Sequence, residues 1–208
     1  MTLTDKSVRD LLSAFSSTDP TPGGGSASAL ASALGASLLA MVAGLPKTRS
    51  GSEDDRKALS AAANALAGIG QQLTDAIDAD TAAYDQVVAA YKRPKASADE
   101  QSARKAAIQT ALRAATDVPL GVMRLSALAL EQANVVAAHG YRPASSDTGV
   151  AIALLTAGTA GARLNVDVNL EAVTDAGYRD SVRAESQRLM ESVGDAATRA
   201  QSLLLRTG

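Results

Sequence analysis

The stretch from Pro20 to Ala43 reads PTPGGGSASALASALGASLLAMVA, and it decides the fold. A proline-rich turn runs into three glycines, and a long run of Ala, Ser, Gly and Leu follows. Small side chains on every face predict a helix that packs closely against several neighbours. Glycines at its start leave backbone N–H groups approachable, and the helix dipole adds positive potential there. The stretch therefore predicts either a tight loop before a core helix or a pocket floor that holds an anion or a polar ligand group.

The rest of the 208-residue chain also reads as helix. Alanine is abundant, β-branched runs are scarce, and apolar residues recur at spacings of three and four. Ser97 followed by Glu100 is the capping-box pattern, and Pro119 either starts a fresh helix or kinks a long one. With no repeat and no linker, we expect one domain over 1–208, an all-α bundle of about five to six helices. The expected helices cover about 5–16, 25–44, 53–92, 97–116 with its continuation to 140, 147–170 and 175–205.

Charge and composition exclude several classes of function. The net charge is −2, there is no cysteine, and His139 is the one histidine. The slightly negative charge argues against a general nucleic-acid binder. The absence of cysteine excludes disulfides and thiolate chemistry, and a single histidine argues against a histidine metal centre. His139 precedes Gly140 at a predicted helix end, where we expect it to interact with the last carbonyls. The uncharged stretch between Asp19 and Lys47 contains prolines, glycines and serines, so we expect a soluble cytoplasmic protein without a membrane span.

A second unusual feature lies inside the predicted helix 53–92, where four aspartates crowd together: Asp75, Asp78, Asp80 and Asp85. Aspartate is a poor helix former, and the middle of a helix is far from the favourable dipole end. One interpretation is a solvated acidic face. The other is a partly buried Asp80, whose raised pKa would suit a general acid or base, or a group that stabilises a cation. Asp80 and Asp85 lie about 140° apart around the axis, so they would flank a groove.

Three further polar residues interrupt apolar helix. Asp147 opens the stretch before Thr148, where an N-cap is the simple interpretation. Asn165 and Asn169 lie four residues apart, so they share a helix face. They could hydrogen-bond between helices or line a polar pocket.

Five stretches, in a fixed order over nearly the whole chain, carry a family resemblance: Pro20–Ala27, Asp80–Asp85 with Pro94-Lys95, Thr116–Leu120, Ser146–Ala151 and Leu164–Asn169. Together they resemble the cyclodeaminase/cyclohydrolase family. This family contains stand-alone methenyltetrahydrofolate cyclohydrolases and the deaminase domain of formiminotransferase-cyclodeaminase. The resemblance implies an all-α homodimer that acts on one-carbon derivatives of tetrahydrofolate. It implies no metal and no redox cofactor, while the charge and composition of the chain predict no nucleic-acid and no membrane partner.

The resemblance also implies site residues. Asp80 and Asp85 match the aspartates that the family associates with catalysis. Gly23, Gly24 and Gly25 match its glycine loop. We predict that these glycines bind the substrate together with other residues of the matching stretches: Ser26, Tyr84, Asp147, Asn165 and Asn169. The glutamate tail of folate needs cations, for which the candidates are Lys92, Arg93, Lys95, Arg142 and Arg163.

The leading hypothesis is hydrolysis of 5,10-methenyltetrahydrofolate to 10-formyltetrahydrofolate, with Asp80 activating water and Asp85 stabilising cationic charge or shuttling the proton. No formiminotransferase domain accompanies the sequence, which favours this reaction over a formiminotetrahydrofolate cyclodeaminase. A non-catalytic helical dimer that binds folate or another small molecule is the third alternative. Residues 44–52 support it, because they read GLPKTRSGS where the family carries a longer basic run and a tyrosine. If that loop closes over the folate, the altered residues predict weak folate binding, a different substrate or a loss of activity.

Overall fold

The computed structural model describes residues 2–205, which form six α-helices and one short 3-10 turn. The all-helical prediction and the expected number of helices are therefore confirmed. Within the described range no residue belongs to a strand, and one isolated bridge pairs Thr48 with Gly140. The elements are α1 (Val8–Phe15), α2 (Gly24–Ala43), α3 (Glu53–Tyr91), α4 (Ala98–His139), η1 (Arg142–Ala144), α5 (Ser145–Glu171) and α6 (Ala176–Leu205).

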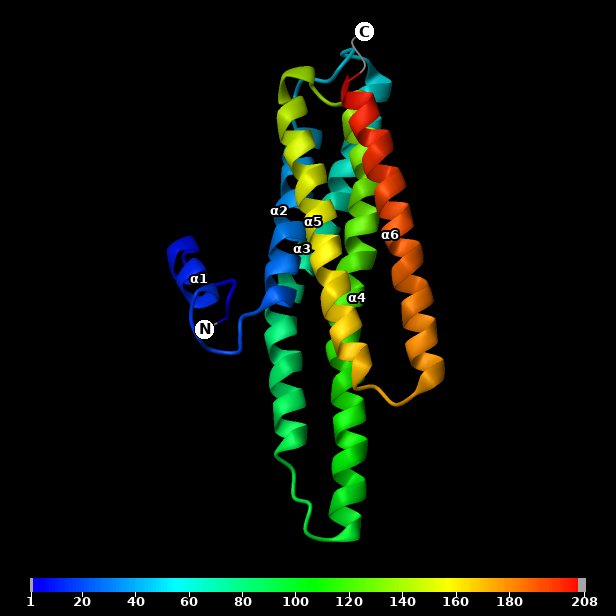
Figure 1. Cartoon of the computed structure of the whole chain (residues 1–208). Coiled ribbons are helices and arrows are strands. Elements are labelled where there is room, and N and C mark those ends of the chain that lie inside the picture. Colours follow the sequence, from blue (N-terminus) through cyan, green and yellow to red (C-terminus); the bar gives the residue numbers. More distant parts are fainter. Residues whose placement is uncertain (1, 206–208) are drawn as a thin grey trace.

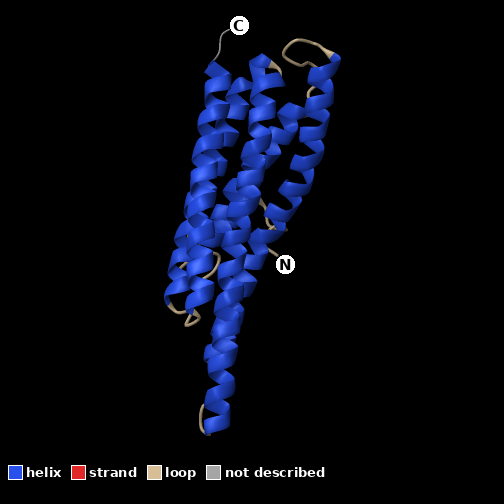
Figure 2. Cartoon of the chain, turned by 90° about the vertical axis from the view of Figure 1, so that its right-hand side faces the viewer, coloured by secondary structure: helices blue, strands red, loops and turns tan. Residues whose placement is uncertain are grey.

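Five long helices form the bundle, and α1 lies to one side of it (Figure 1). The central helix α2 packs between α3 and α5, and α4 contacts α3, α5 and α6. A helix of 39 residues such as α3 is about 60 Å long at 1.5 Å per residue. The extra length appears as a hairpin of α3 and α4 that extends beyond the other helices (Figures 1 and 2).

Small residues let α2 and α5 approach closely, as the sequence predicts. A Cβ atom added to Gly158 of α5 would overlap Ser32 Oγ and lie 2.7 Å from the carbonyl oxygen of Ser28. The buried hydroxyls at this contact are paired, because Ser126 of α4 donates to Ser32 Oγ at 2.9 Å. Glycine at this position therefore brings the two helix backbones together without leaving a buried polar group unpaired.

Helix ends follow the sequence at some positions and depart from it at others. Ser97 and Glu100 form the predicted capping box, and Asp175 caps α6 by accepting the Tyr178 N–H at 3.0 Å. The helix α4 runs unbroken through Pro119, so the alternative of a fresh start there is wrong. The predicted N-cap at Asp147 is also wrong, because α5 begins earlier, directly after η1.

Asp55 and His139 connect helices at the end of the bundle where the loop between α2 and α3 lies. His139 Nδ1 lies 2.7 Å from Asp55 Oδ1, so the predicted partnership of His139 with the last helix carbonyls is wrong. Arg49 takes that role instead and donates to the carbonyls of Ala137 at 2.9 Å and His139 at 2.8 Å. Hydrogen bonds from Ser50 and His139 hold the pKa of Asp55 well below its ordinary value.

Two helical stretches are long and apolar enough to cross a membrane by length and composition alone: Gly24–Ala43 and Arg142–Glu171. Core helices of globular proteins meet the same criteria, and 56% of the α2 window is buried in the bundle.

Candidate active site

The carboxylate of Asp80 lies against the first turn of α2. Its Oδ2 atom accepts the backbone N–H of Ser26 at 2.8 Å and lies 3.0 Å from Ser26 Oγ. Gly23 occupies the cap position of α2 and has no side chain to cap the helix. Asp80 of α3 therefore satisfies a free donor at the start of α2 and places a negative charge at the positive end of the helix dipole. The anion expected at this helix end is an aspartate of the protein itself.

Gly25 makes this approach possible. A Cβ atom at Gly25 would overlap the carboxylate of Asp80, so any larger residue would displace the aspartate. Ser26 is fully buried, and Asp80 is half-buried. Burial raises the pKa of Asp80 above its ordinary value, while the two hydrogen bonds from Ser26 oppose that rise. A carboxyl group whose pKa is raised in this way is better suited than an exposed one to take up and return a proton.

A cavity of about 300 Å³ opens beside Asp80, between the loop before α2 and the helices α3, α4 and α5. It contains seven of the predicted site residues: Gly23, Gly24, Gly25, Asp80, Tyr84, Asn165 and Asn169. Its other lining residues are Pro20, Thr21, Val87, Leu112 and Ala115. Segments far apart in the sequence thus meet around one carboxylate, while Ser26 lies buried behind it.

Besides the buried Ser26, two predicted site residues do not line this cavity. Asp85 is exposed on α3 and does not line it. Asp147 sits in the first turn of α5, 18 positions before Asn165, which corresponds to about 27 Å along the helix. The loop 46–52 follows the far end of α2, a whole helix length from Gly24. Within one chain, that loop does not close over the cavity.

The two asparagines have their amide nitrogens committed to backbone carbonyls. Asn165 Nδ2 donates to the Gly161 carbonyl of its own helix at 2.9 Å, whereas Asn169 Nδ2 reaches across to the Ala115 carbonyl of α4 at 2.8 Å. Asn169 therefore fulfils both predicted roles, since it bonds between helices and lines the cavity. Ala115 stands four residues before Pro119, which has no N–H to offer that carbonyl. The proline thus creates the acceptor that orients Asn169, a link that the sequence analysis missed.

The other aspartates of the group on α3 lie on the surface or bind the N-terminal segment. Asp78 accepts the backbone N–H of Leu3 and the hydroxyl of Thr4 at 2.7 Å, which ties residues before α1 to α3. Asp75 accepts from Gln71 at 2.9 Å on an exposed face. Asp80 is thus the member of the cluster that faces the cavity.

Charge around the cavity is sparse. Among its lining residues in the described part of the chain, Asp80 and Tyr84 are the titratable ones, and none is Lys or Arg. The cations considered for the folate tail therefore lie elsewhere; Arg163, for example, pairs with Asp167 at 3.0 Å. A half-buried carboxylate without a neighbouring cation favours a ligand that carries positive charge or N–H donors.

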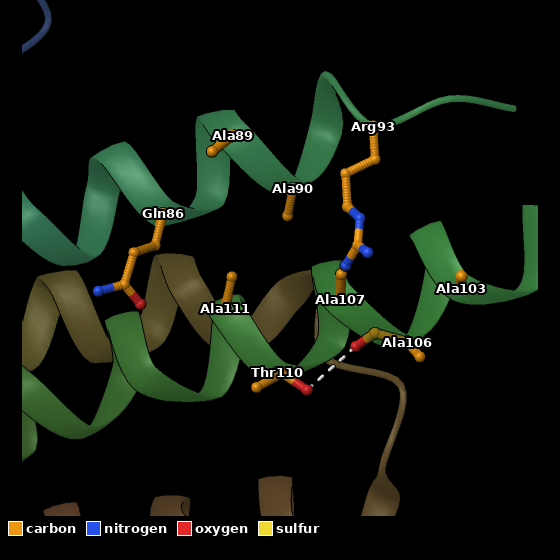
Figure 3. Close-up of a pocket in the computed structure, with 9 residues that line it drawn as sticks. All are labelled: Gln86, Ala89, Ala90, Arg93, Ala103, Ala106, Ala107, Thr110 and Ala111. Carbon is orange, nitrogen blue, oxygen red and sulfur yellow. Dashed lines mark hydrogen bonds between the residues drawn. The ribbon is translucent and has the colours of Figure 1, made fainter. Parts of the chain in front are cut away.

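A larger and more open groove of about 630 Å³ lies on the protruding hairpin of α3 and α4. Figure 3 shows that alanines form most of its lining and that Arg93 reaches from the end of α3 toward Ala107. It contains no carboxylate and no histidine, so it offers no group for acid–base chemistry.

Comparisons with known proteins identify the family of the chain. Residues 7–188 match the sequence profile of the family described as formiminotransferase-cyclodeaminase. The chain is 35% identical over 190 residues to a methenyltetrahydrofolate cyclohydrolase of Methylorubrum extorquens, with 91% of each chain covered. It is 31% identical over 204 residues to the formimidoyltransferase-cyclodeaminase of Sus scrofa, covering 98% of this chain but 37% of that protein. The crystal structure of a formiminotetrahydrofolate cyclodeaminase from Thermotoga maritima superposes with a TM-score of 0.85 at 26% identity, covering 96% of each chain.

Proposed function

The chain belongs to the formiminotransferase-cyclodeaminase family and is a folate one-carbon enzyme, and we propose that it hydrolyses 5,10-methenyltetrahydrofolate to 10-formyltetrahydrofolate. The observation that carries the proposal is the single carboxylate of Asp80, held half-buried at the wall of a cavity with no lysine or arginine in its lining. The cyclohydrolase of Methylorubrum extorquens supports it, because that relative matches over nearly its whole length.

Asp80 acts as general base in this proposal. The substrate carries a delocalised cation centred on its amidinium carbon, and the Asp80 carboxylate stabilises that charge. As the oxygen of a water molecule bonds to this carbon, Asp80 accepts one of the water protons. The proton then passes to N5 while the bond between carbon and N5 breaks. The new hydroxyl loses its remaining proton and becomes the formyl oxygen, so that one proton is released overall.

The size of the cavity fits part of such a substrate. About 300 Å³ lies at the lower end of the range for small-molecule sites. We propose that the fused rings with the one-carbon group enter the cavity and that the glutamate tail stays outside it. The side-chain oxygens of Asn165 and Asn169 are then available as acceptors for ring N–H groups, because both amide nitrogens already bind carbonyls.

Cyclisation of formiminotetrahydrofolate with release of ammonia is the second candidate. It is favoured by the structural likeness to the Thermotoga maritima protein, whose chain is covered to 96%. In this reaction Asp80 would instead donate a proton to the leaving nitrogen. The same geometry serves both reactions, since the carboxyl group exchanges a proton with the cavity in either direction.

The deciding experiment is the loss of methenyltetrahydrofolate absorbance with purified protein, compared with the spontaneous rate in the same buffer. We expect acceleration by the wild type, and a loss of about 10²–10⁴ of it in Asp80→Asn. No acceleration by the wild type, together with ammonia release from formiminotetrahydrofolate, would replace the proposal with the second candidate. Full activity of Asp80→Asn in both assays would remove Asp80 from the chemistry.

We also propose that the protein is a homodimer that buries the outer face of α5. This face carries exposed apolar residues at spacings of three and four: Val150, Ala153, Ala157, Ala160, Leu164 and Val168. Light scattering in detergent-free buffer is expected to give twice the chain mass for the wild type and for Leu205→Glu, a control at an exposed leucine of α6. Leu164→Glu is expected to give monomers with unchanged helicity. A monomeric wild type would contradict the proposal.

A further inference from the structure

The two oxygens of the Asp80 carboxylate have different surroundings. Oδ2 receives the Ser26 backbone N–H at 2.8 Å and has the Ser26 hydroxyl at 3.0 Å. No donor among residues 2–205 makes a hydrogen bond to Oδ1. Oδ2 is thus hydrogen-bonded to Ser26, whereas Oδ1, which lies against Gly25, has no hydrogen-bond partner in the described chain.

The Ser26 hydroxyl has a choice of acceptors. Its oxygen lies 2.8 Å from the Ile77 carbonyl oxygen, 3.0 Å from Asp80 Oδ2 and 3.4 Å from Thr81 Oγ1. A serine hydroxyl has a single hydrogen, so it cannot donate to Ile77 and Asp80 at the same time. An ionised carboxylate is the stronger acceptor, and a neutral carboxyl group competes less well with the carbonyl.

This arrangement lets the buried hydroxyl stay hydrogen-bonded whichever form Asp80 takes. It donates to Oδ2 when Asp80 is ionised and can turn to the Ile77 carbonyl when Asp80 is protonated. A change of protonation at Asp80 therefore leaves no buried hydroxyl unpaired, which would otherwise cost free energy. The backbone N–H of Ser26 cannot turn away, so it holds Oδ2 in both states.

We infer that Ser26 is a positioning residue that reserves Oδ2 of Asp80 for the protein and leaves Oδ1 as the atom that exchanges protons with the folate substrate. The inference rests on the proposed function and deepens it, because it assigns the proton transfer to one atom. It also gives Ser26 a role different from direct contact with substrate, since Ser26 is fully buried behind the aspartate.

Few other groups in the cavity lining can change the proton affinity of Asp80. From α3, Tyr84 is the other titratable side chain in the cavity lining. The residues that α2, α4 and α5 contribute to the lining are glycines, Leu112, Ala115, Asn165 and Asn169, none of which titrates. The hydroxyl of Ser26 is therefore the side-chain donor whose removal should change the proton affinity of Asp80 most.

The test compares Ser26→Ala with Ser28→Ala. Ser28 is a buried serine two residues further along α2, and its hydroxyl donates to the Gly24 carbonyl of its own helix at 2.6 Å. Both substitutions favour helix and remove one buried hydroxyl, so they are matched for packing and propensity. The first readout is ¹³C NMR titration of the Asp80 carboxyl carbon in the substrate-free protein. The second is the pH profile of kcat/KM with methenyltetrahydrofolate.

We expect Ser26→Ala to move the Asp80 titration upward by about one pH unit, the size of one lost hydrogen bond to a charged group. The acidic limb of the kcat/KM profile should move by the same amount, and Ser28→Ala should leave both in place. Equal titrations in Ser26→Ala and the wild type would overturn the inference. The NMR titration needs no substrate, so an inactive wild type with a shifted Ser26→Ala titration would refute the proposed reaction while the link between Ser26 and Asp80 stands.

Discussion

Gly25→Ala tests whether Asp80 is held against α2 as the structure shows. The new Cβ atom would overlap the carboxylate, so Asp80 must swing away and lose both hydrogen bonds from Ser26. Hydrogen bonds to a charged group contribute about 1.5–3 kcal/mol, while alanine in place of glycine stabilises a helix by about 1 kcal/mol. Because the Ser26 hydroxyl can turn to the Ile77 carbonyl, only the backbone bond is lost without replacement, and the net expected loss is about 0.5–2 kcal/mol, or about 1–8 °C in Tm for a domain of this size.

The activity should fall much further than the stability. A displaced Asp80 no longer presents its carboxylate to the cavity, so the rate with methenyltetrahydrofolate should approach that of Asp80→Ala. Thermal unfolding followed by circular dichroism and the absorbance assay measure the two effects on the same preparation.

Gly24→Ala is the matched control, because a Cβ atom there meets only the Asn165 side chain, at an ordinary contact distance of 3.5 Å. It should leave Asp80 bound to Ser26 without lowering Tm, and any loss of activity should be smaller than in Gly25→Ala. Positions 25 and 80 should also be strongly coupled: in an Asp80→Ala background, Gly25→Ala should be neutral or stabilising, since nothing remains to be displaced. Wild-type turnover in Gly25→Ala, or the same stability loss in both backgrounds, would refute the reasoning.

Three further predictions concern other parts of the molecule. Asp85→Asn should leave turnover near the wild-type value in the absorbance assay, because Asp85 is exposed outside the cavity; a loss as large as that of Asp80→Asn would contradict the placement. Pro119→Ala supplies an N–H that competes with Asn169 for the Ala115 carbonyl, so KM for methenyltetrahydrofolate should rise while Tm does not fall. An unchanged KM would show that Pro119 does not influence the site through Asn169. Asp55→Asn should lower the unfolding free energy by about 1.5–3 kcal/mol at pH 7 in urea titrations. Because the pKa of Asp55 is depressed in the folded state, this contribution is complete above the ordinary value of 3.8 and declines as pH falls from there toward the folded-state pKa, so the difference between the variant and the wild type should shrink steadily below pH 3.8.

The helices were predictable because local chemistry determines them. The capping box at Ser97, the small residues of α2 and the apolar spacing of α3 each act within a few residues of the chain. Pro119 shows where local rules fail. Its missing N–H predicts a break or a kink, but the carbonyl that it leaves free is satisfied by Asn169 of another helix, and α4 continues.

The site was predictable only in part, because it depends on which helix faces which. The sequence indicated a bare helix start at Gly23–Gly25 and an unusual aspartate at Asp80, but as two separate features. The structure joins them, since Asp80 is the group that binds the start of α2. Asp147 matched a family motif equally well, yet its place in the first turn of α5 separates it from the cavity by most of that helix. His139 was likewise assigned to the nearest carbonyls, because its true partner Asp55 lies 84 positions away.

Asp80 has a structural role and a proposed catalytic role, and its variants must be compared with both in mind. Its carboxylate caps α2 through Ser26, and the same carboxylate is the proposed general base. Asparagine keeps an oxygen that can accept both Ser26 donors but cannot take up a proton, whereas alanine removes the cap as well. Asp80→Asn should therefore lose activity with a small loss of stability, and Asp80→Ala should lose both. If the two variants unfold at the same temperature, the hydrogen bonds to Ser26 contribute little to stability. The presence of an aspartate in the middle of α3 would then have to be explained by chemistry alone.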